Sequence, residues 1–569
     1  MLCITMLTSL FSCDMSIFNP STNTETTPNS KAESDTEEPT DVFVLTVENL
    51  SEYRIIIPDK LTTELSEAVK SLQDHISAIT GKEPEAVSDY ISEDSDIFYE
   101  SEYEILVGKT NRAASEELYK DIRTNDYGYA MVGKKILIFG NSSETARSSV
   151  TAFKADVLNK AKNEKDALLR SGESNLNVGL YTYDPLTVNG ISIKNYSIVY
   201  PQRATLGEKD ISQRLAAWIE INTGYTVKCI SDKEEPREYE IQVGNTNRIS
   251  SEQISKMNSY VTSDEQYYIS GNNGIIWATG RNSGAILSAV TGMINLINSN
   301  GELNMQSYIC ANKKAASLSV MSYNIRGMMD SDKRNSEDVI VSIKERDPDI
   351  FAPQEATASA AMWISRLDNA LSGEYACYKG LCVGKYSQYQ PIYYKKDRLE
   401  LISATSKYLT HTPDRKSRLE GAEYDRIVTI VVLRDKETGV QFVYANNHFD
   451  TAGYIVRTEE AKILAKMLEE YPLMPLIVGG DFNTEATTTP IQTLISKSRL
   501  KLGEDLADEK TLGGSGASDY QTRGEKIIDI VLVSAESISV NKYEIWDNKT
   551  NGKYPSDHLP VCIELVVIN

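Results

Sequence analysis

Polar residues at the ends of apolar segments limit the fold of this chain more than any other feature of its sequence. From Leu318 onward, most of the phrases SYNIRG, QE, NNHFD, GGDFN, IDIVLVS and SDHLP follow or contain a strongly apolar segment. Such short apolar runs are typical of buried strands, and α/β enzymes build their sites from polar side chains at strand ends. We therefore predict an α/β domain with one site formed by Asn324, Glu355, His448, Asp481, Asn483, Asp529, Asp557 and His558.

The residue types in this set indicate a metal-dependent reaction. The set contains carboxylates, amides and two of the four histidines of the chain, but no cysteine. Oxygen ligands with histidine suit a hard cation such as Mg²⁺ better than a structural zinc ion. Mn²⁺ and Ca²⁺ are alternatives with the same preference for oxygen. The sequence therefore predicts a metal-dependent hydrolase of phosphate esters.

The length of the chain indicates how many domains it forms, and its net charge bears on the class of substrate. A chain of 569 residues is too long for one core, so we expect about three domains. The formal net charge is −22. Nucleic-acid binding depends on cations that meet phosphates, so this charge disfavours DNA or RNA as the substrate. It does not exclude them, because a local groove can still be positive.

The N-terminal segment predicts export. Residues 1–13 resemble the end of a bacterial lipoprotein signal, in which a lipid is attached to the cysteine, here Cys13. No Lys or Arg precedes Cys13, whereas a secretory signal normally begins with positive charge, so a chance apolar start is the alternative. Residues 14–41 are rich in Ser, Thr, Glu and Pro and predict a disordered tether. We expect an exported protein that is anchored to the cell membrane by lipid.

The remaining cysteines indicate no disulfide framework or zinc site. They are odd in number and lack the spacing of zinc ligands. Isolated buried thiols are favoured over a bridge between Cys377 and Cys382. The five residues are Cys229, Cys310, Cys377, Cys382 and Cys562.

The first half of the chain contains an internal repeat, over residues 42–160 and 185–300. The phrase YEILVGKTNR, which ends at Arg112, returns as YEIQVGNTNR, which ends at Arg248. In each copy an amphipathic helical stretch that ends in Thr-Gly precedes the phrase, and a strand, a glycine and a second helix follow it. Glycine after a helix supplies the left-handed position that ends it. Each copy therefore predicts a small α/β sandwich.

These repeats resemble the accessory N-terminal domain of family-20 hexosaminidases, which contributes no chemistry in those enzymes. One interpretation is that the repeats bind a surface glycan. The other, which we favour, is that they form a spacer in which the Asn-Arg pairs at Asn111 and Asn247 brace a turn.

Residues 316–569 resemble the endonuclease/exonuclease/phosphatase superfamily, because all of its principal phrases occur here in order. The superfamily includes deoxyribonuclease I, neutral sphingomyelinases and inositol-polyphosphate 5-phosphatases. The resemblance implies a four-layer α/β sandwich of the deoxyribonuclease I type. The expected fold class is therefore α/β, with this sandwich preceded by two small α/β sandwich repeats.

The resemblance also implies roles for individual residues. Glu355 is the principal metal ligand, with Asp557, Asn324 and Asp481 as further ligands. Asp529 orients His558, which acts as the general base with Asp481 close by. The substrate phosphate is contacted by Asn324, His448, Asn483 and Arg426. For Arg426, an ordinary ion pair with Asp425 or Glu423 is the alternative.

Three functions remain open. The leading one is in-line attack of water on a phospholipid headgroup, a sugar phosphate or a similar small ester outside the membrane. The second is a surface or secreted nuclease, for which Lys395, Lys396 and the basic cluster at Arg415, Lys416 and Arg418 could line a groove, although a solvated loop is the favoured interpretation of that cluster. The third is a glycan-binding surface protein with an inert hydrolase domain.

Overall fold

The computed structural model describes residues 42–90, 100–272, 274–326, 336–358, 363–384, 388–517 and 522–568. The predicted lipid-attachment residue Cys13 and the tether at 14–41 lie outside the described residues. The chain divides into two compact units, of which one extends to Asp184 and includes Glu220–Thr226, and the other contains Pro185–Ile219 and the rest of the chain. Among the described helices, none is both long and apolar enough to cross a bilayer.

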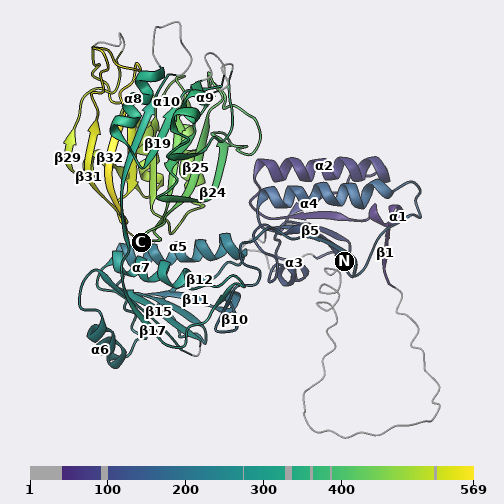
Figure 1. Ribbon diagram of the computed structural model, residues 1–569. Helices are drawn as coiled ribbons and strands as arrows, with labels where there is room; N and C mark the ends of the chain where they lie inside the picture. The colour runs from purple at the N-terminus through teal and green to yellow at the C-terminus, as the bar shows by residue number, and fades with distance from the viewer. Residues whose placement is uncertain are drawn as a thin grey trace, which may run out of the picture. The chain divides into compact units, whose positions relative to one another are not determined.

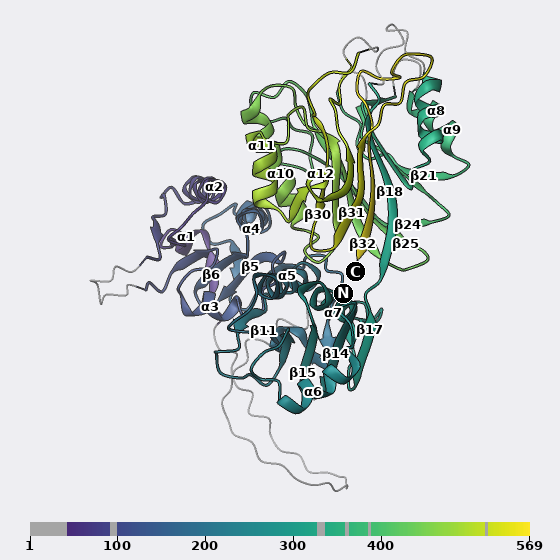
Figure 2. The same ribbon diagram turned by 90° about the vertical axis from the view of Figure 1, so that its left-hand side faces the viewer.

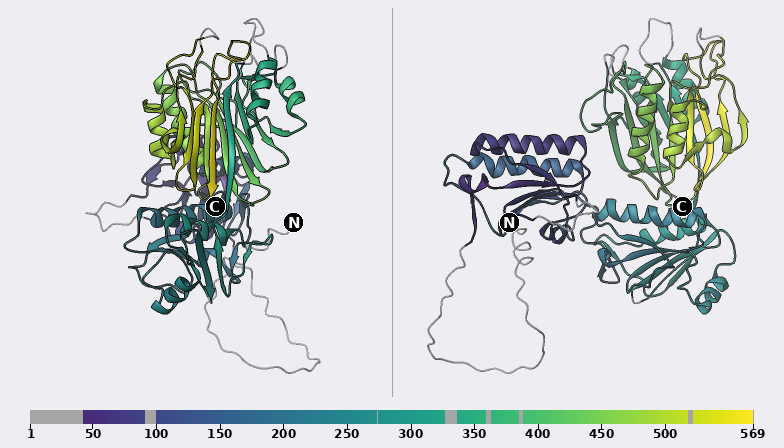
Figure 3. Two further views of the ribbon diagram at one scale, coloured as in Figure 1. Left: turned by 60° about the vertical axis from the view of Figure 1, so that its left-hand side comes forward. Right: turned by 180° about the vertical axis from the view of Figure 1, so that it is seen from behind.

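The first repeat is a six-stranded sheet with helices on both faces. Its strand order is β3-β2-β4-β6-β5-β8, and the two long helices α2 and α4 lie side by side over one face (Figure 3, right). Its elements are β1 (Val44–Thr46), α1 (Val47–Leu50), β2 (Arg54–Ile57), α2 (Thr63–Thr80), β3 (Ala86–Ser88), β4 (Glu104–Val107), α3 (Ala113–Leu118), β5 (Tyr127–Val132), β6 (Lys135–Gly140), α4 (Ser143–Asp156), β7 (Ala167–Arg170) and β8 (Ser174–Asn177).

The second repeat has the same strand order, β12-β11-β13-β15-β14-β17. Gly81 and Gly224 follow α2 and α5 with φ of 73° and 75°, as the Thr-Gly pairs predict. The elements are β9 (Thr187–Val188), β10 (Ile191–Ser192), β11 (Ser197–Tyr200), α5 (Leu206–Thr223), β12 (Lys228–Ser231), β13 (Glu240–Val243), α6 (Ser251–Tyr260), β14 (Gln266–Asn272), β15 (Ile275–Gly280), α7 (Ser283–Ile294), β16 (Glu302–Leu303) and β17 (Tyr308–Asn312). The last strands of the repeats, β8 and β17, lie beyond the ends that the sequence predicted. Both are short edge strands without a strong apolar run, so no sequence pattern marks them.

The C-terminal domain consists of two facing sheets, each covered by helices on its outer face, as Figures 1 and 2 show. The sheet orders are β21-β23-β19-β18-β32-β31-β29 and β24-β25-β26-β27-β30-β28. The elements are β18 (Ala315–Asn324), α8 (Ser336–Arg346), β19 (Ile350–Gln354), β20 (Ala356–Thr357), α9 (Trp363–Leu371), β21 (Tyr375–Tyr378), β22 (Gln388–Tyr389), β23 (Ile392–Lys395), β24 (Leu399–Tyr408), β25 (Ile427–Asp435), β26 (Gln441–His448), α10 (Tyr454–Leu468), β27 (Leu476–Asp481), α11 (Thr489–Lys497), β28 (Leu500–Leu502), α12 (Gly503–Leu506), β29 (Ala507–Thr511), β30 (Asp529–Ser534), β31 (Ile538–Ile545) and β32 (Val561–Ile568).

Three apolar cores hold the four layers together, and they confirm the predicted sandwich. The central core lies between the sheets and includes Val320, Phe442 and Ile563. A second core packs α8 and α9 on the first sheet, and a third packs α10 and α11 on the other. Strands in both sheets bury side chains on both faces, which explains why they appear in the sequence as continuous apolar runs rather than alternating ones.

The repeated phrase of the first half holds a buried ion pair in each copy. Glu104 pairs with Arg112 at 3.1 Å in the first repeat, and Glu240 pairs with Arg248 in the second. Burial raises the pKa of Glu104, but hydrogen bonds from Arg112, the backbone of Ser101 and other partners outweigh it and bring the pKa to about 2. These contacts support the structural interpretation of the phrase.

We predict that Arg112→Ala destabilises the first repeat by about 2 kcal/mol, since the buried carboxylate of Glu104 loses its hydrogen bonds from Arg112 and keeps its ion pairs with Arg54 and Lys135. Hydrogen exchange of the β4 amides in the full chain measures this loss as a lower opening free energy. Arg147→Ala, at an exposed position on α4, is the control and should change the opening free energy by no more than about 0.5 kcal/mol. Equal protection in the Arg112 variant and in the control would show that the pair is not a structural brace.

Helix α10 carries one carboxyl group into the core of the C-terminal domain. Glu460 is 1% exposed, and its Oε2 accepts a hydrogen bond of 2.9 Å from the backbone N–H of Asp450. Burial raises the pKa of Glu460 from its ordinary value of 4.5 to about 8, despite the nearby charge of Arg426. The folded protein therefore holds this proton more tightly than the unfolded chain does.

It follows that the free energy of unfolding falls as pH rises from about 4.5 to about 8, because the unfolded chain releases the Glu460 proton in this range while the folded state still holds it. Glu460→Gln keeps the acceptor oxygen and removes the ionisation. We expect the unfolding temperature of this variant, relative to the wild type, to increase between pH 5 and pH 9. Glu469→Gln, at an exposed position, should show no such trend. A constant difference across the pH range would contradict the buried ionisation.

Candidate active site

The first sheet brings its predicted site residues to one end. Asn324 is the last residue of β18 and pairs with Gln354, the last residue of the parallel strand β19, so that Glu355 follows directly. Strand β32 runs antiparallel and begins beside Ser322, which brings the preceding residues Asp557 and His558 to the same end. The hydroxyl of Ser556 donates a hydrogen bond of 2.7 Å to the backbone oxygen of Asn324 and fixes this segment there.

The second sheet contributes three residues in one row. His448 ends β26 and pairs with Asp481, which ends the parallel strand β27. Asp481 in turn pairs with Asp529, the first residue of the antiparallel strand β30. The three side chains are almost entirely buried.

Asn324 connects the carboxylates of the two sheets. Its Nδ2 donates hydrogen bonds of 3.2 Å to Oε1 of Glu355 and 3.0 Å to Oδ2 of Asp481. Its Oδ1 accepts a hydrogen bond of 2.9 Å from the backbone N–H of Arg326. The amide nitrogen, rather than the oxygen, thus faces the carboxylates. In this arrangement Asn324 positions Glu355 and Asp481, and its role as a metal ligand stays a prediction.

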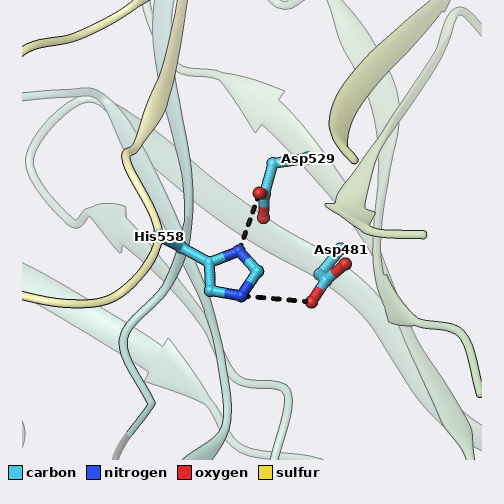
Figure 4. A group of neighbouring side chains, drawn as sticks. All are labelled: Asp481, Asp529 and His558. Carbon is cyan, nitrogen blue, oxygen red and sulfur yellow. Dashed lines mark hydrogen bonds and ion pairs between the residues drawn. The ribbon is translucent and has the colours of Figure 1, made fainter. Parts of the chain in front are cut away.

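His558 is held between two aspartates (Figure 4). Its Nδ1 lies 2.8 Å from Oδ2 of Asp529, and its Nε2 lies 3.8 Å from Oδ2 of Asp481. Burial lowers the pKa of His558, but the charges of Asp529 and Asp481 outweigh this effect and raise the pKa well above its ordinary value. The hydrogen bond to Asp529 fixes the proton on Nδ1, so Nε2 is the atom that can exchange a proton with a substrate or water.

His448 has the opposite electrostatic character. Its Nε2 lies 3.4 Å from Oδ2 of Asp481, and burial together with the charges of Arg426 and His558 lowers its pKa well below the ordinary value. A histidine of this kind stays neutral and can donate one N–H to a phosphate oxygen. Burial and the charge of Asp529 raise the pKa of Asp481, which lies between the two histidines, to about 6.

Backbone strain is concentrated at the same place. Glu355 and Asn483 adopt positive φ angles of 58° and 50°, which non-glycine residues adopt mainly where the surrounding structure requires it. Gly480 is required for a different reason, because a Cβ at this position would lie 2.0 Å from the backbone oxygen of Asn447. Strand β27 ends at Asp481, whose Oδ1 accepts a hydrogen bond of 2.8 Å from the backbone N–H of Asn483.

Arg326 is a site residue that the sequence analysis missed. Its guanidinium pairs with the carboxylate of Asp557, and its φ of 43° lies in the left-handed region. The phrase SYNIRG contained Arg326, but an arginine after a strand end has no pattern of its own. Its partner Asp557 lies more than 200 positions away in the sequence.

Arg426 lies just before β25 and is 6% exposed. Its Nε is 3.6 Å from Oδ2 of Asp450, so the ion pair that the structure gives it is with neither Asp425 nor Glu423. Asp450 also accepts hydrogen bonds from the backbone N–H groups of Glu423 and Tyr424, at 3.1 and 2.8 Å. Asp450 therefore fixes the segment that leads into Arg426 beside the site.

The donor set fits a hard cation. Among the described residues, Asp481, Asp529 and His558 bring ligand atoms within 4.8 Å of one another and could hold an ion. The close hydrogen bond between His558 and Asp529 indicates a proton-transfer pair instead. The carboxylates on either side of Asn324, those of Glu355 and Asp481, would supply oxygen ligands, and a cation there would oppose the burial and the charge of Asp529 that raise the pKa of Asp481.

Several solved structures resemble the C-terminal part of the chain. An endonuclease/exonuclease/phosphatase family protein from Bacteroides thetaiotaomicron is 28% identical, with a TM-score of 0.41 over 45% of this chain and 99% of that chain. A mannosyl-6-phosphatase from the same organism is 28% identical, with a TM-score of 0.41 over 44% of this chain and 99% of that chain. A third, from Bacteroides vulgatus, is 25% identical, with a TM-score of 0.41 over 44% and 98% of the two chains. No curated protein matches the chain.

The family model that matches is that of the Endonuclease/Exonuclease/phosphatase family, over residues 321–558. The match includes every candidate site residue from Asn324 to His558, and it confirms the resemblance of this part of the chain. The resemblance of the two repeats to hexosaminidase accessory domains stays a prediction. Residues 321–558 thus match the Endonuclease/Exonuclease/phosphatase family, and this match supports a hydrolase domain.

Proposed function

We propose that the C-terminal domain hydrolyses a small phosphate ester by in-line attack of water, with the help of Mg²⁺. The observation that carries this proposal is the hydrogen bond of His558 to Asp529 beside Asp481, at the end of two sheets where Glu355 and Asn324 also meet. A base, an orienting carboxylate and oxygen ligands for a cation are the parts that phosphoester hydrolysis requires.

The proton of the attacking water passes to Nε2 of His558. The imidazolium that forms is stabilised by Asp529 on one side and by Asp481 on the other, which is the cause of its raised pKa. Neutralisation of Asp481 by a bound cation would lower this proton affinity, so that His558 is available as a base closer to neutral pH.

The phosphate is bound from the other side of Asp481. Neutral His448 donates one N–H to a non-bridging oxygen, and Arg426 supplies positive charge close to it. The amide of Asn483 is a further candidate for binding the phosphate. Its Nδ2 already donates a hydrogen bond of 2.9 Å to the backbone oxygen of Phe449. A cation held by Glu355, Asp481 and Asp557 would neutralise the charge that develops on the leaving oxygen.

We expect Glu355→Gln and His558→Ala each to lower kcat by roughly 10³-fold or more, since removal of one member of a catalytic unit has effects of this size. Turnover of bis-p-nitrophenyl phosphate and p-nitrophenyl phosphate by residues 42–569 measures this. EDTA should abolish wild-type turnover, and added Mg²⁺ or Mn²⁺ should restore it.

The matched controls are Glu437→Gln and His411→Ala. Glu437 is exposed, and the side chain of His411 is 70% exposed and 3.7 Å from Glu459. Both variants should retain full turnover. Near-normal turnover in the Glu355 or His558 variant would refute the assignment. Absence of turnover in the wild-type protein on every ester would favour the third function, a glycan-binding protein with an inert hydrolase domain.

The surroundings of the basic residues favour a small ester over nucleic acid. Lys395 donates hydrogen bonds of 2.9 and 2.8 Å to the backbone oxygen and the carboxylate of Asp347, at the start of β19. Glu355 follows the other end of that strand, about 20 Å away at the usual rise per residue. Lys395 and Lys396 therefore do not line a groove at the site.

The second basic cluster is largely neutralised by its own loop. Arg418 pairs with Asp425 at 2.8 Å, and Lys416 lies 3.8 Å from the same carboxylate. The loop lies at the site end of β24 and β25, but its charges are balanced locally. A panel of sphingomyelin, inositol phosphates, sugar phosphates and plasmid DNA, compared in the assay above, separates the small-ester proposal from the nuclease. Export and lipid attachment at Cys13 remain part of the proposal for the location of the substrate.

A further inference from the structure

One face of the second repeat presents an aromatic pocket away from the hydrolase site. Tyr308 stacks on Tyr260 and Tyr268, with ring centroids 4.5 and 5.8 Å apart and interplanar angles of 30° and 18°. Trp277 meets Tyr268 edge-on at 5.5 Å. The rings come from α6, β14, β15 and β17 (Figure 2). Tyr268, Trp277 and Tyr308 line a cavity of about 240 Å³, and Tyr260 supports the ring of Tyr308.

The remaining lining of this cavity is polar. Amides and hydroxyls stand beside the rings, together with the ammonium group of Lys256, which lies 5.2 Å above Tyr308. None of the described residues that line the cavity carries a carboxylate, so its chemistry does not favour a cation as the ligand. The polar residues that line it are Gln253, Lys256, Ser270, Asn272, Gln306 and Ser307.

We propose that this pocket binds one ring of an uncharged sugar. A pyranose has a flat face of C–H groups that packs on an aromatic ring, and a rim of hydroxyls that pairs with amide and hydroxyl side chains. Ligand pockets generally combine apolar and aromatic walls with a few polar groups that orient the ligand. Trp277 is a rigid part of the wall, because its Nε1 donates a hydrogen bond of 2.7 Å to the backbone oxygen of Gly244.

The first repeat shows that the fold itself does not require these rings. The two sheets have the same strand order, and Tyr127 pairs with Gly140 as Tyr267 pairs with Gly280. Counting along the strands from this common register places the equivalents of Tyr268, Trp277 and Tyr308 at Gly128, Leu137 and Ser174. The equivalent face of the first repeat thus lacks these three rings, although Phe139 and Tyr119 pack on it.

Exposure also argues against a purely structural role. Tyr268 and Trp277 are buried and contribute to the local apolar core. Tyr308 and Tyr260, by contrast, are 39% and 37% exposed. Adjacent exposed rings on one face are more consistent with ligand binding than with packing alone. The glycan interpretation of the repeats therefore applies to the second copy, while the first retains the features of a spacer.

The test uses residues 42–569 and the methyl glycosides of mannose, glucose, galactose and N-acetylglucosamine, followed by a glycan array. Calorimetry and tryptophan fluorescence measure binding. Tyr308→Ser installs the residue that the first repeat carries at the equivalent position, and Gln253→Ala removes an amide from the rim. Tyr90→Ser, at a tyrosine in the first repeat that is 63% exposed, is the matched control.

We expect at least one sugar to bind, and both pocket variants to weaken binding by tenfold or more, while the Tyr90 variant binds as the wild type does. Phosphate-ester turnover should be equal in all four proteins, which separates this proposal from that for the hydrolase site. The proposal is overturned if no sugar on the panel or the array binds the wild type, or if Tyr308→Ser binds with unchanged affinity. Preferential binding of phenol over every sugar would also overturn it, because the pocket would then be merely apolar.

Discussion

The amide of Asn324 joins the two halves of the C-terminal site, and the rest of the site depends on the alignment that makes this contact. Glu355 comes from one sheet and Asp481 from the other, and one Nδ2 atom donates to both. Such a contact requires that the two sheets face each other with their polar strand ends at the same edge. The apolar core between the sheets provides that alignment, and strand register then brings His448, Asp529 and His558 around Asp481.

Electrostatics gives these neighbouring groups different roles. His558 and His448 both lie close to Asp481, yet their pKa values shift in opposite directions. The carboxylates of Asp529 and Asp481 raise the pKa of His558, whereas burial and the positive charge of Arg426 lower the pKa of His448. Pairs of titratable groups whose surroundings separate their pKa values are typical of acid–base sites. The buried carboxylates of Asp481 and Asp529 would also stabilise a cation at this site.

The sequence predicted features that are encoded locally. Each site residue lies at or near an end of an apolar strand, so the short phrases around Glu355, Asp481 and His558 were sufficient to identify them. Contacts between distant segments were not predictable. Arg326 pairs with Asp557, and Asp450 accepts from the segment before Arg426, because of how strands are ordered in the sheets. The left-handed backbone at Glu355 and Asn483 likewise had no signal, because neither is a glycine. The edge strands β8 and β17 were missed because pairing, rather than composition, defines them.

The location of a bound cation tests the central claim most directly, because the structure offers two places for it. Anomalous diffraction from crystals soaked in Mn²⁺ would locate the ion. Our account predicts one ion bound by the carboxylates of Glu355, Asp481 and Asp557, with Nδ1 of His558 still hydrogen-bonded to Asp529. An ion bound by His558 and Asp529 would contradict the account, because that histidine could then no longer act as the base.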